Sequence, residues 1–206
     1  TTAIIAGDTF NSSNPVIGLD SVGALRAART GTANAVALTT PTGETVPDRG
    51  VVYSFTPPAN NTASTTITFN GGAAYTMKTV TGVNLPADYL RSAVDTFCYF
   101  DGIDVVADRQ LQIGSNSVGD WHKHADGNLI QYGGDTGLSG STGAVITLPV
   151  AYSEGGFTIQ LTPQNINPRF PTYAGVSVSE FEVRVWAVNE TQQTTNFKWL
   201  TLGKWY

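Results

Sequence analysis

Short apolar segments rich in β-branched and aromatic residues recur along the chain, separated by glycine, proline or asparagine. They begin roughly ten residues apart, a spacing typical of antiparallel sandwiches and barrels, in which short strands alternate with tight turns. We therefore expect strands at residues 35–39, 51–55, 65–69, 75–80, 94–100 and 103–106, and again at 128–133, 144–150, 156–162, 176–187 and 197–202. The longest of these changes phase at Ser179-Glu180, which predicts a bulge or a turn.

One segment near the start has a different period. Val22, Leu25 and Ala28 are at helical spacing, and Asp20 or Ser21 can cap the first turn. The sequence thus predicts one short helix over residues 20–29.

The chain has few charged residues, 13% of the total, which is about half of what a soluble domain carries. Its polar surface must therefore come from hydroxyl and amide groups, as in β-proteins that meet sugars or pack against copies of themselves. The net charge of −5 argues against a nucleic-acid partner, because phosphate binding needs clustered lysine and arginine. No apolar run reaches the about 18 residues that a membrane span needs, so we expect no membrane insertion.

No constellation of catalytic residues stands out. Cys98, the only cysteine, lies in an apolar run, where a buried thiol without an activating base is expected. The Gly- and Ser-rich stretch 137–143 lacks the following helix that a nucleophile elbow requires. Asp101 and Asp126 stand beside glycine, where they act as turn formers. We expect no catalytic residue and no cofactor, and a glycosidase-like carboxylate pair remains an alternative.

The last part of the chain carries three motifs in order. The stretch 121–134, WHKHADGNLIQYGG, is followed by an apolar strand and by the terminal WLTLGKWY. Together they resemble the receptor-binding tip domain that closes many bacteriophage tail fibres. The first motif of that family is filled by Trp121, Asp126, Gly127, Leu129, Ile130, Gln131, Tyr132 and Gly133, the second by Leu148, Pro149, Ala151 and Tyr152, and the third by residues 199–203. The resemblance implies a domain that binds a receptor and does not catalyse a reaction.

A second resemblance covers the first half. Residues 61–71, NTASTTITFNG, are similar to a strand and turn of tail-fibre neck modules. Residues 83–90 and 99–102 fit the continuation of that module. Ala63 stands where the family prefers glycine, which puts the conformation of this turn in question.

These features predict an all-β chain in four parts. Residues 1–30 are a linker or shaft remnant with the short helix, and residues 31–109 are a small β-sandwich or barrel, the neck module. Residues 110–120 link it to residues 121–206, an antiparallel β-sandwich tip domain. The resemblance also implies a homotrimer.

His122 and His124, the only histidines, are two residues apart and so face one side of a strand. Two imidazoles are too few for a closed metal site, and we expect them on a solvated edge without metal. In a trimer with this strand near the axis, three copies would supply six nitrogens, and that alternative stays open.

Amide and aromatic side chains provide the candidate ligand site. The segment 164–173 combines amides, one arginine and two aromatic residues with prolines, which predicts a stiff loop with donors and stacking surfaces. Trp186 lies opposite in phase to its apolar neighbours on the strand, so we expect it to be exposed and able to stack on a sugar. The candidate glycan-binding residues are Asn165, Asn167, Arg169, Phe170, Tyr173 and Trp186.

We therefore expect a virion protein of a tail fibre or capsid spike, made in the bacterial cytoplasm and active outside the cell. Its partners would be a bacterial surface polysaccharide, its own copies in the homotrimer, and other virion fibre or baseplate proteins. Two alternatives stay open: a glycan-depolymerase tailspike fragment, and an architectural fibre or head-decoration protein without a ligand.

Overall fold

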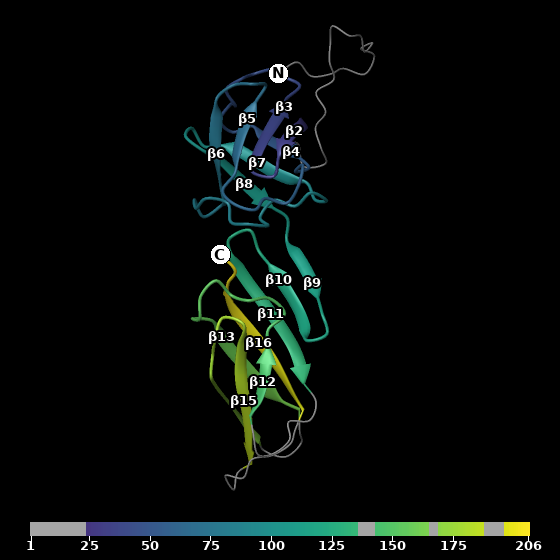
Figure 1. Cartoon of the computed structure of the whole chain (residues 1–206), viewed down its shortest axis with the longest axis vertical. Coiled ribbons are helices and arrows are strands. Elements are labelled where there is room, and N and C mark those ends of the chain that lie inside the picture. Colours follow the sequence, from purple (N-terminus) through teal and green to yellow (C-terminus); the bar gives the residue numbers. More distant parts are fainter. Residues whose placement is uncertain (1–23, 136–142, 165–168, 188–195) are drawn as a thin grey trace. The chain divides into compact units, whose positions relative to one another are not determined.

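The computed structural model describes residues 24–135, 143–164, 169–187 and 196–206, and every helix or strand assigned within them is a strand. The chain divides into two compact units, Thr1–Gln110 and Leu111–Tyr206, each with its own sheets (Figure 1). The prediction of an all-β chain is confirmed. Within the described ranges, no helix has the length and apolar character needed to span a membrane.

The first unit is built on one mixed sheet of eight strands. Their order in the sheet is β1-β4-β7-β8-β6-β5-β3-β2. The bounds are β1 Leu25–Arg26, β2 Ala28–Thr32, β3 Ala35–Thr39, β4 Val52–Phe55, β5 Thr66–Phe69, β6 Ala74–Lys78, β7 Thr96–Phe100 and β8 Val105–Arg109. The two edge strands, β1 and β2, are separated in the chain only by Ala27, so the sheet must curl until its edges meet. The result is barrel-like, one of the two forms that the sequence predicts.

The helix predicted over 20–29 is wrong for its described residues, 24–29, which form β1 and the start of β2. Leu25 and Arg26 pair in parallel with β4, and the amide of Ala27 donates to the carbonyl of Ser54 at 2.9 Å. Ala24 and Ala27 are buried. The small apolar residues of this segment thus contact the interior of the barrel and do not form one face of a helix. A weak local preference for helix loses here to backbone pairing with a distant strand.

Buried amides fix the long connections of the first unit. The side chain of Asn61 donates to the carbonyls of Ala63 and Pro86 at 2.9 and 2.7 Å, and accepts from the amide of Leu90 at 2.7 Å. These bonds hold the segment 85–90, whose Tyr89 is fully buried. Ala63 is not among the described residues with positive φ, so this turn needs no glycine there.

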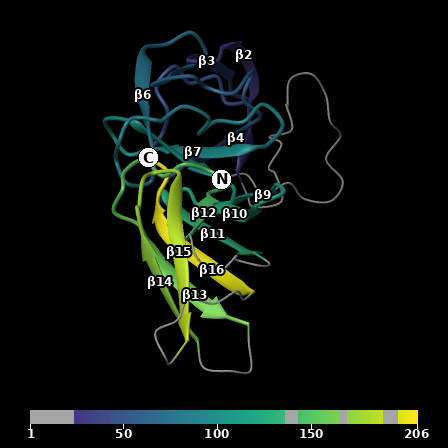
Figure 2. The same cartoon turned by 60° about the horizontal axis from the view of Figure 1, so that its bottom comes forward.

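The second unit is a sandwich of two antiparallel sheets (Figure 2). The five-stranded sheet has the order β13-β16-β11-β10-β9, and the three-stranded sheet the order β12-β15-β14. The bounds are β9 Gln112–Ser115, β10 Gly119–Lys123, β11 Asn128–Asp135, β12 Ala144–Thr147, β13 Thr158–Pro163, β14 Arg169–Ala174, β15 Glu180–Ala187 and β16 Phe197–Lys204. The predicted antiparallel sandwich is confirmed. Its core includes Leu129, Phe181, Val183, Phe197 and Trp199.

Two segments differ from the sequence-based expectation. Residues 110–120, predicted as a linker, contain β9 and the start of β10. Gly114 makes this pairing possible, since a Cβ there would lie 2.1 Å from the ring of Trp121. The predicted loop 164–173 contains all of β14 except its last residue. β14 pairs with β15 and includes Pro171. β14 is an edge strand, where proline is tolerated.

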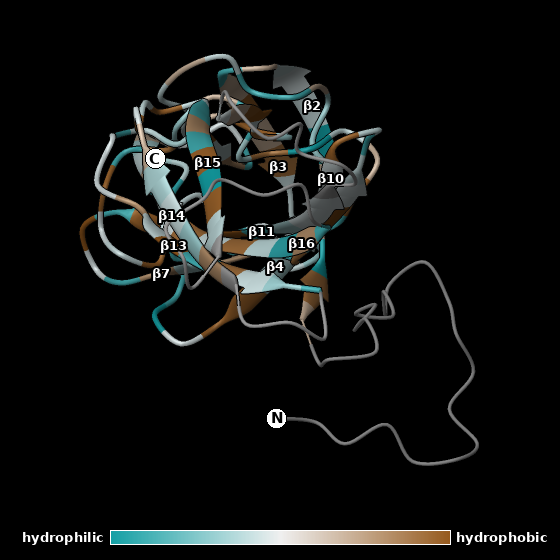
Figure 3. Ribbon diagram, turned by 90° about the horizontal axis from the view of Figure 1, so that it is seen from below, coloured by the Kyte–Doolittle hydropathy of each residue, from teal (hydrophilic) through white to brown (hydrophobic). Residues whose placement is uncertain are grey.

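The predicted break at Ser179-Glu180 is a turn. The amide of Ser177 donates to the carbonyl of Glu180 at 2.9 Å, and β15 begins at Glu180. Along β15 apolar and polar residues alternate, visible as bands in Figure 3. Phe181, Val183 and Val185 are buried in the core, so the residues between them face outward.

Gln131 connects the five-stranded sheet to the segment that follows β12. Its side chain is fully buried, and its amide donates to the carbonyl of Val150 at 2.9 Å and accepts from the amide of Val150 at 2.8 Å. Nearby, the buried hydroxyl of Tyr152 donates to Thr201 at 2.7 Å. Gln131 therefore anchors the segment that follows β12 to the opposite sheet.

Candidate functional site

The outward side of the three-stranded sheet gathers aromatic and charged side chains from β14 and β15. The register pairs Phe170 with Trp186, Thr172 with Arg184, and Ala174 with Glu182. Residues paired across strands point to the same side of a sheet. We call the surface formed by these six residues the outer face.

The orientation of the indole on the outer face is fixed by a hydrogen bond. Nε1 of Trp186 donates to the hydroxyl of Thr172 at 3.0 Å. Phe170, opposite in register, is 55% exposed. Two aromatic side chains at neighbouring positions, one with a fixed ring, form a surface suited to stacking on an apolar sugar face.

An ion pair lies further along the outer face. Nε of Arg184 donates to Oε1 of Glu182 at 2.6 Å, and the side chains are 47% and 25% exposed. Solvent screening makes such a pair weak in stability terms. Its donors and acceptors remain accessible to a polar ligand.

The structure divides the predicted site residues. Phe170 and Trp186 meet on the outer face, whereas Tyr173 pairs with the buried Val183 and so belongs to the other side of β14, where it is 53% exposed. Arg169 begins β14, and its side chain lies outside the described part, as do Asn165 and Asn167. The sequence reasoning missed Thr172, Glu182 and Arg184 as site residues. The two-residue period of β15 already placed Glu182 and Arg184 on the side of Trp186.

His122 and His124 lie on and just after β10. The ring of His122 meets Tyr132 edge to face, with centroids 5.7 Å apart. The carbonyl of His124 accepts from Nε1 of Trp205 at 3.0 Å. Among the described residues of one chain, no group of three or more His, Cys, Asp or Glu could hold a metal ion.

The outward side of the five-stranded sheet mixes apolar and polar side chains. The register aligns Ile113, His122, Ile130, Leu202 and Thr158 in one row, and Ser115, Asp120, Tyr132, Leu200 and Gln160 in the next. Ile113, Leu202 and Tyr132 are 64%, 44% and 39% exposed. We call the surface formed by Ile113, His122, Ile130, Leu202, Tyr132 and Leu200 the apolar face. Exposed apolar side chains rimmed by polar residues are found at interfaces with other proteins.

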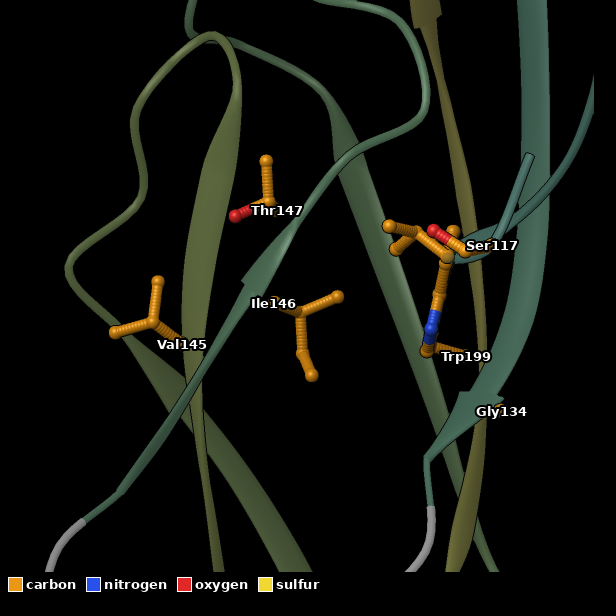
Figure 4. A pocket seen from close by; sticks show the side chains of 7 residues that line it. Ser117, Gly134, Val145, Ile146, Thr147 and Trp199 are labelled. Atoms are coloured by element: carbon orange, nitrogen blue, oxygen red, sulfur yellow. The ribbon is translucent and has the colours of Figure 1, made fainter.

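A cavity of about 270 Å³ lies between the β9–β10 turn and β12. Figure 4 shows Ile146 on the side of β12 that faces Trp199, and Val145 on the other side. Ser117 and Thr147 supply hydroxyl groups, but Trp199 is only 2% exposed and offers no stacking surface. This cavity and two others in the described part of the second unit are lined without Asp or Glu. These three cavities therefore lack the carboxylate pair of a glycosidase.

The two packed sheets define the second unit as an antiparallel β-sandwich domain. Residues 123–204 match the family described as "Putative tail fiber protein gp53-like, C-terminal". The second unit is thus a phage-like tail-fibre C-terminal domain, which confirms the prediction from its motifs. No curated protein sequence matches the chain significantly.

Solved pyocin fibres are similar to part of the chain. An R2 pyocin fibre of P. aeruginosa is 15% identical with a TM-score of 0.39, and the match covers 47% of this chain and 26% of the fibre chain. An N-truncated R1-type pyocin tail fibre is also 15% identical, with a TM-score of 0.34, and the match covers 47% of this chain and 87% of that one.

Proposed function

We propose that this chain is part of a virion fibre or spike that attaches to a saccharide on the bacterial host surface through the outer face. The observation that carries the proposal is the aromatic pair of the exposed Phe170 and the partly buried Trp186, with the indole held by Thr172. A ring held in place loses little entropy when it stacks on a sugar. Asn165, Asn167 and Arg169, which precede Phe170 in the sequence, are proposed as further ligand contacts, and Tyr173 as a contact from the other side of β14.

The proposed assembly is a homotrimer in which the apolar face lies between copies. Burial of Ile113, Tyr132 and Leu202 would remove exposed apolar surface from water, which favours association. Three identical sites on one particle also convert weak single contacts into strong attachment, often by factors of about 100 or more. A shallow surface such as the outer face then suffices.

The proposed setting is the particle itself. Tail fibres are components of virions or phage-like particles, so the remaining partners would be other fibre or baseplate proteins. Synthesis in the bacterial cytoplasm and action outside the cell follow from that setting. The proposed activity is binding without catalysis.

A cell-labelling assay tests the saccharide proposal. The fluorescently labelled protein is incubated with host cells and with purified envelope polysaccharide as a competitor. We expect Trp186→Ala and Phe170→Ala each to lower labelling about tenfold or more. Loss of one aromatic ring that stacks on a nucleic-acid base costs about 1–3 kcal/mol, and we expect a similar loss for a stacked sugar. Tyr99→Ala, which truncates an exposed aromatic side chain in the first unit, is the matched control.

Other results would favour the alternatives. Labelling that survives both aromatic changes would place the binding surface elsewhere. A complete lack of labelling, with folded and assembled protein, would favour an architectural fibre or head-decoration role. Shortening of the polysaccharide during incubation would identify a depolymerase.

A further inference from the structure

The ion pair on the outer face stands beside the aromatic side chains. Glu182, Arg184 and Trp186 alternate with buried residues along β15, so each is about 7 Å from the next on the same surface. The pair uses Nε of the guanidinium and Oε1 of the carboxylate. A ligand stacked on Trp186 would therefore extend directly over Arg184 and Glu182.

Among the described outward side chains of the three-stranded sheet, negative charges outnumber positive ones. Glu180 is exposed and begins β15 two residues before Glu182, on the same side. β12 has no charged residue. The outward side chains of the described strands thus provide one cation, Arg184, against two carboxylates.

Such a surface discriminates against acidic ligands. A uronate, a sialate or a phosphate near Glu182 meets a like charge, and the compensating charge of Arg184 is already neutralised by its partner. A sugar hydroxyl both donates and accepts hydrogen bonds. Two adjacent hydroxyls could accept from the guanidinium and donate to the carboxylate without disturbing the balance of charge.

The carboxylate of Glu182 has a defined place. A Cβ on Gly143 would lie 2.0 Å from Oε1 of Glu182, and one on Gly175 would lie 3.8 Å from the Cβ of Glu182. Glycine at position 143 leaves the space that the carboxylate occupies. The backbone of Gly143 and the guanidinium of Arg184 both lie close to the carboxylate of Glu182 and so limit its position.

We infer that the site formed by Phe170, Arg184 and Trp186 takes uncharged sugars with adjacent hydroxyls, and that Glu182 excludes acidic sugars. The inference rests on the proposed saccharide binding and adds the class of sugar to it. Glu182 is thus a specificity-determining residue.

The test uses the assembled full chain on an array of matched oligosaccharides. Each neutral hexose oligomer of glucose, galactose or mannose is paired with its uronate counterpart. We expect the protein to bind at least one neutral oligomer about tenfold more tightly than its uronate counterpart. This factor lies between those expected from repulsion of two like charges in bulk water and at a protein surface. Glu182→Gln, which keeps the shape, should reduce that preference to about threefold or less.

Two further variants make the result specific. Glu180→Gln removes the same charge but leaves the Arg184–Glu182 pair intact, so it should keep most of the preference. Trp186→Ala should abolish binding of both members of a pair. Circular dichroism and urea midpoints verify that all variants are folded.

Each outcome decides a different question. Tighter binding of the uronate, or equal effects of Glu182→Gln and Glu180→Gln, would overturn the inference, while binding that depends on Trp186 would still support the proposed function. Absence of binding to every oligosaccharide and to host polysaccharide would overturn both.

Discussion

At the scale of single residues, the sequence shows which residue stands at each position but not which groups its side chain bonds to. Gln131 stands in a strand where a polar side chain would be expected to face solvent, yet it is fully buried and bonded to the backbone of Val150. Gln131 therefore has a structural role in the motif of residues 121–134, because it holds the backbone of Val150. Cys98 was predicted correctly from its apolar neighbours, and burial raises the pKa of its thiol to about 12, so it stays protonated.

Replacing Gln131 by alanine should destabilise the second unit by about 1–3 kcal/mol, because the partly buried amide and carbonyl of Val150 would both lose their partner. Urea unfolding followed by tryptophan fluorescence measures this. All four tryptophans lie after residue 110, so the signal reports on this unit alone. Gln160→Ala, at an exposed position of β13, is the control. Equal midpoints for the two variants would contradict the assigned role of Gln131.

At the scale of elements, a strand could be predicted where apolar and polar residues alternate within it. Prediction failed where a segment becomes a strand only because it pairs with a distant part of the chain. β3, β7, β15 and β16 are recognisable from period and residue type. β14 contains a proline and becomes a strand because it pairs with β15. β9 contains Gly114, which leaves room for the ring of Trp121 on the neighbouring strand. The segment after residue 23 was predicted as helix for the same reason, since its pairing with β4 is not visible locally.

The end of β16 closes the β10–β11 turn. Nζ of Lys204 donates to the carbonyl of Asp126 at 3.0 Å, Nε1 of Trp205 to that of His124 at 3.0 Å, and the hydroxyl of Tyr206 to that of Ala125. Lys123 also lies over the ring of Trp205, with Nζ 4.9 Å from the centroid. Three consecutive side chains thus satisfy the carbonyls of one turn.

Trp205→Ala should loosen this turn and lower the stability of the second unit by about 1–3 kcal/mol, since a partly buried ring and one hydrogen bond are lost. Hydrogen exchange followed by mass spectrometry should show faster exchange at residues 124–128. Lys198→Ala, at an exposed position earlier in β16, should leave this exchange unchanged. Unaltered protection in Trp205→Ala would mean that the turn holds its conformation without the terminal residues.

At the scale of the whole molecule, composition and motifs predicted the class of fold. The low fraction of charged residues predicted a surface of hydroxyl and amide groups that contacts sugars or other copies of the chain. They did not indicate which sheet would carry which surface. That division depends on the register: one sheet turns Ile113, Ile130 and Leu202 outward, and the other turns out Phe170 and Trp186. The proposed contact between copies and the proposed ligand contact therefore lie on separate sheets.

The native mass tests the role of the apolar face. Sedimentation equilibrium at micromolar concentration should give three times the 21.8 kDa of one chain. Leu202→Asp should reduce the mass to that of one chain, because a carboxylate would have to be desolvated at the interface. Val145→Asp, at a 60% exposed apolar position on the other sheet, should keep the higher mass. A wild-type mass of one chain would disprove the assembly.

The strict alternation along β15 separates what must be kept from what is open to change. Phe181, Val183 and Val185 fill the interior, while every second position reaches solvent. In the proposed site, exchanges at 170, 182, 184 and 186 therefore change the ligand surface while the buried residues that hold the fold stay the same. Under the proposed function, adaptation to a resistant host would need only a few exchanges on the β14–β15 strand pair.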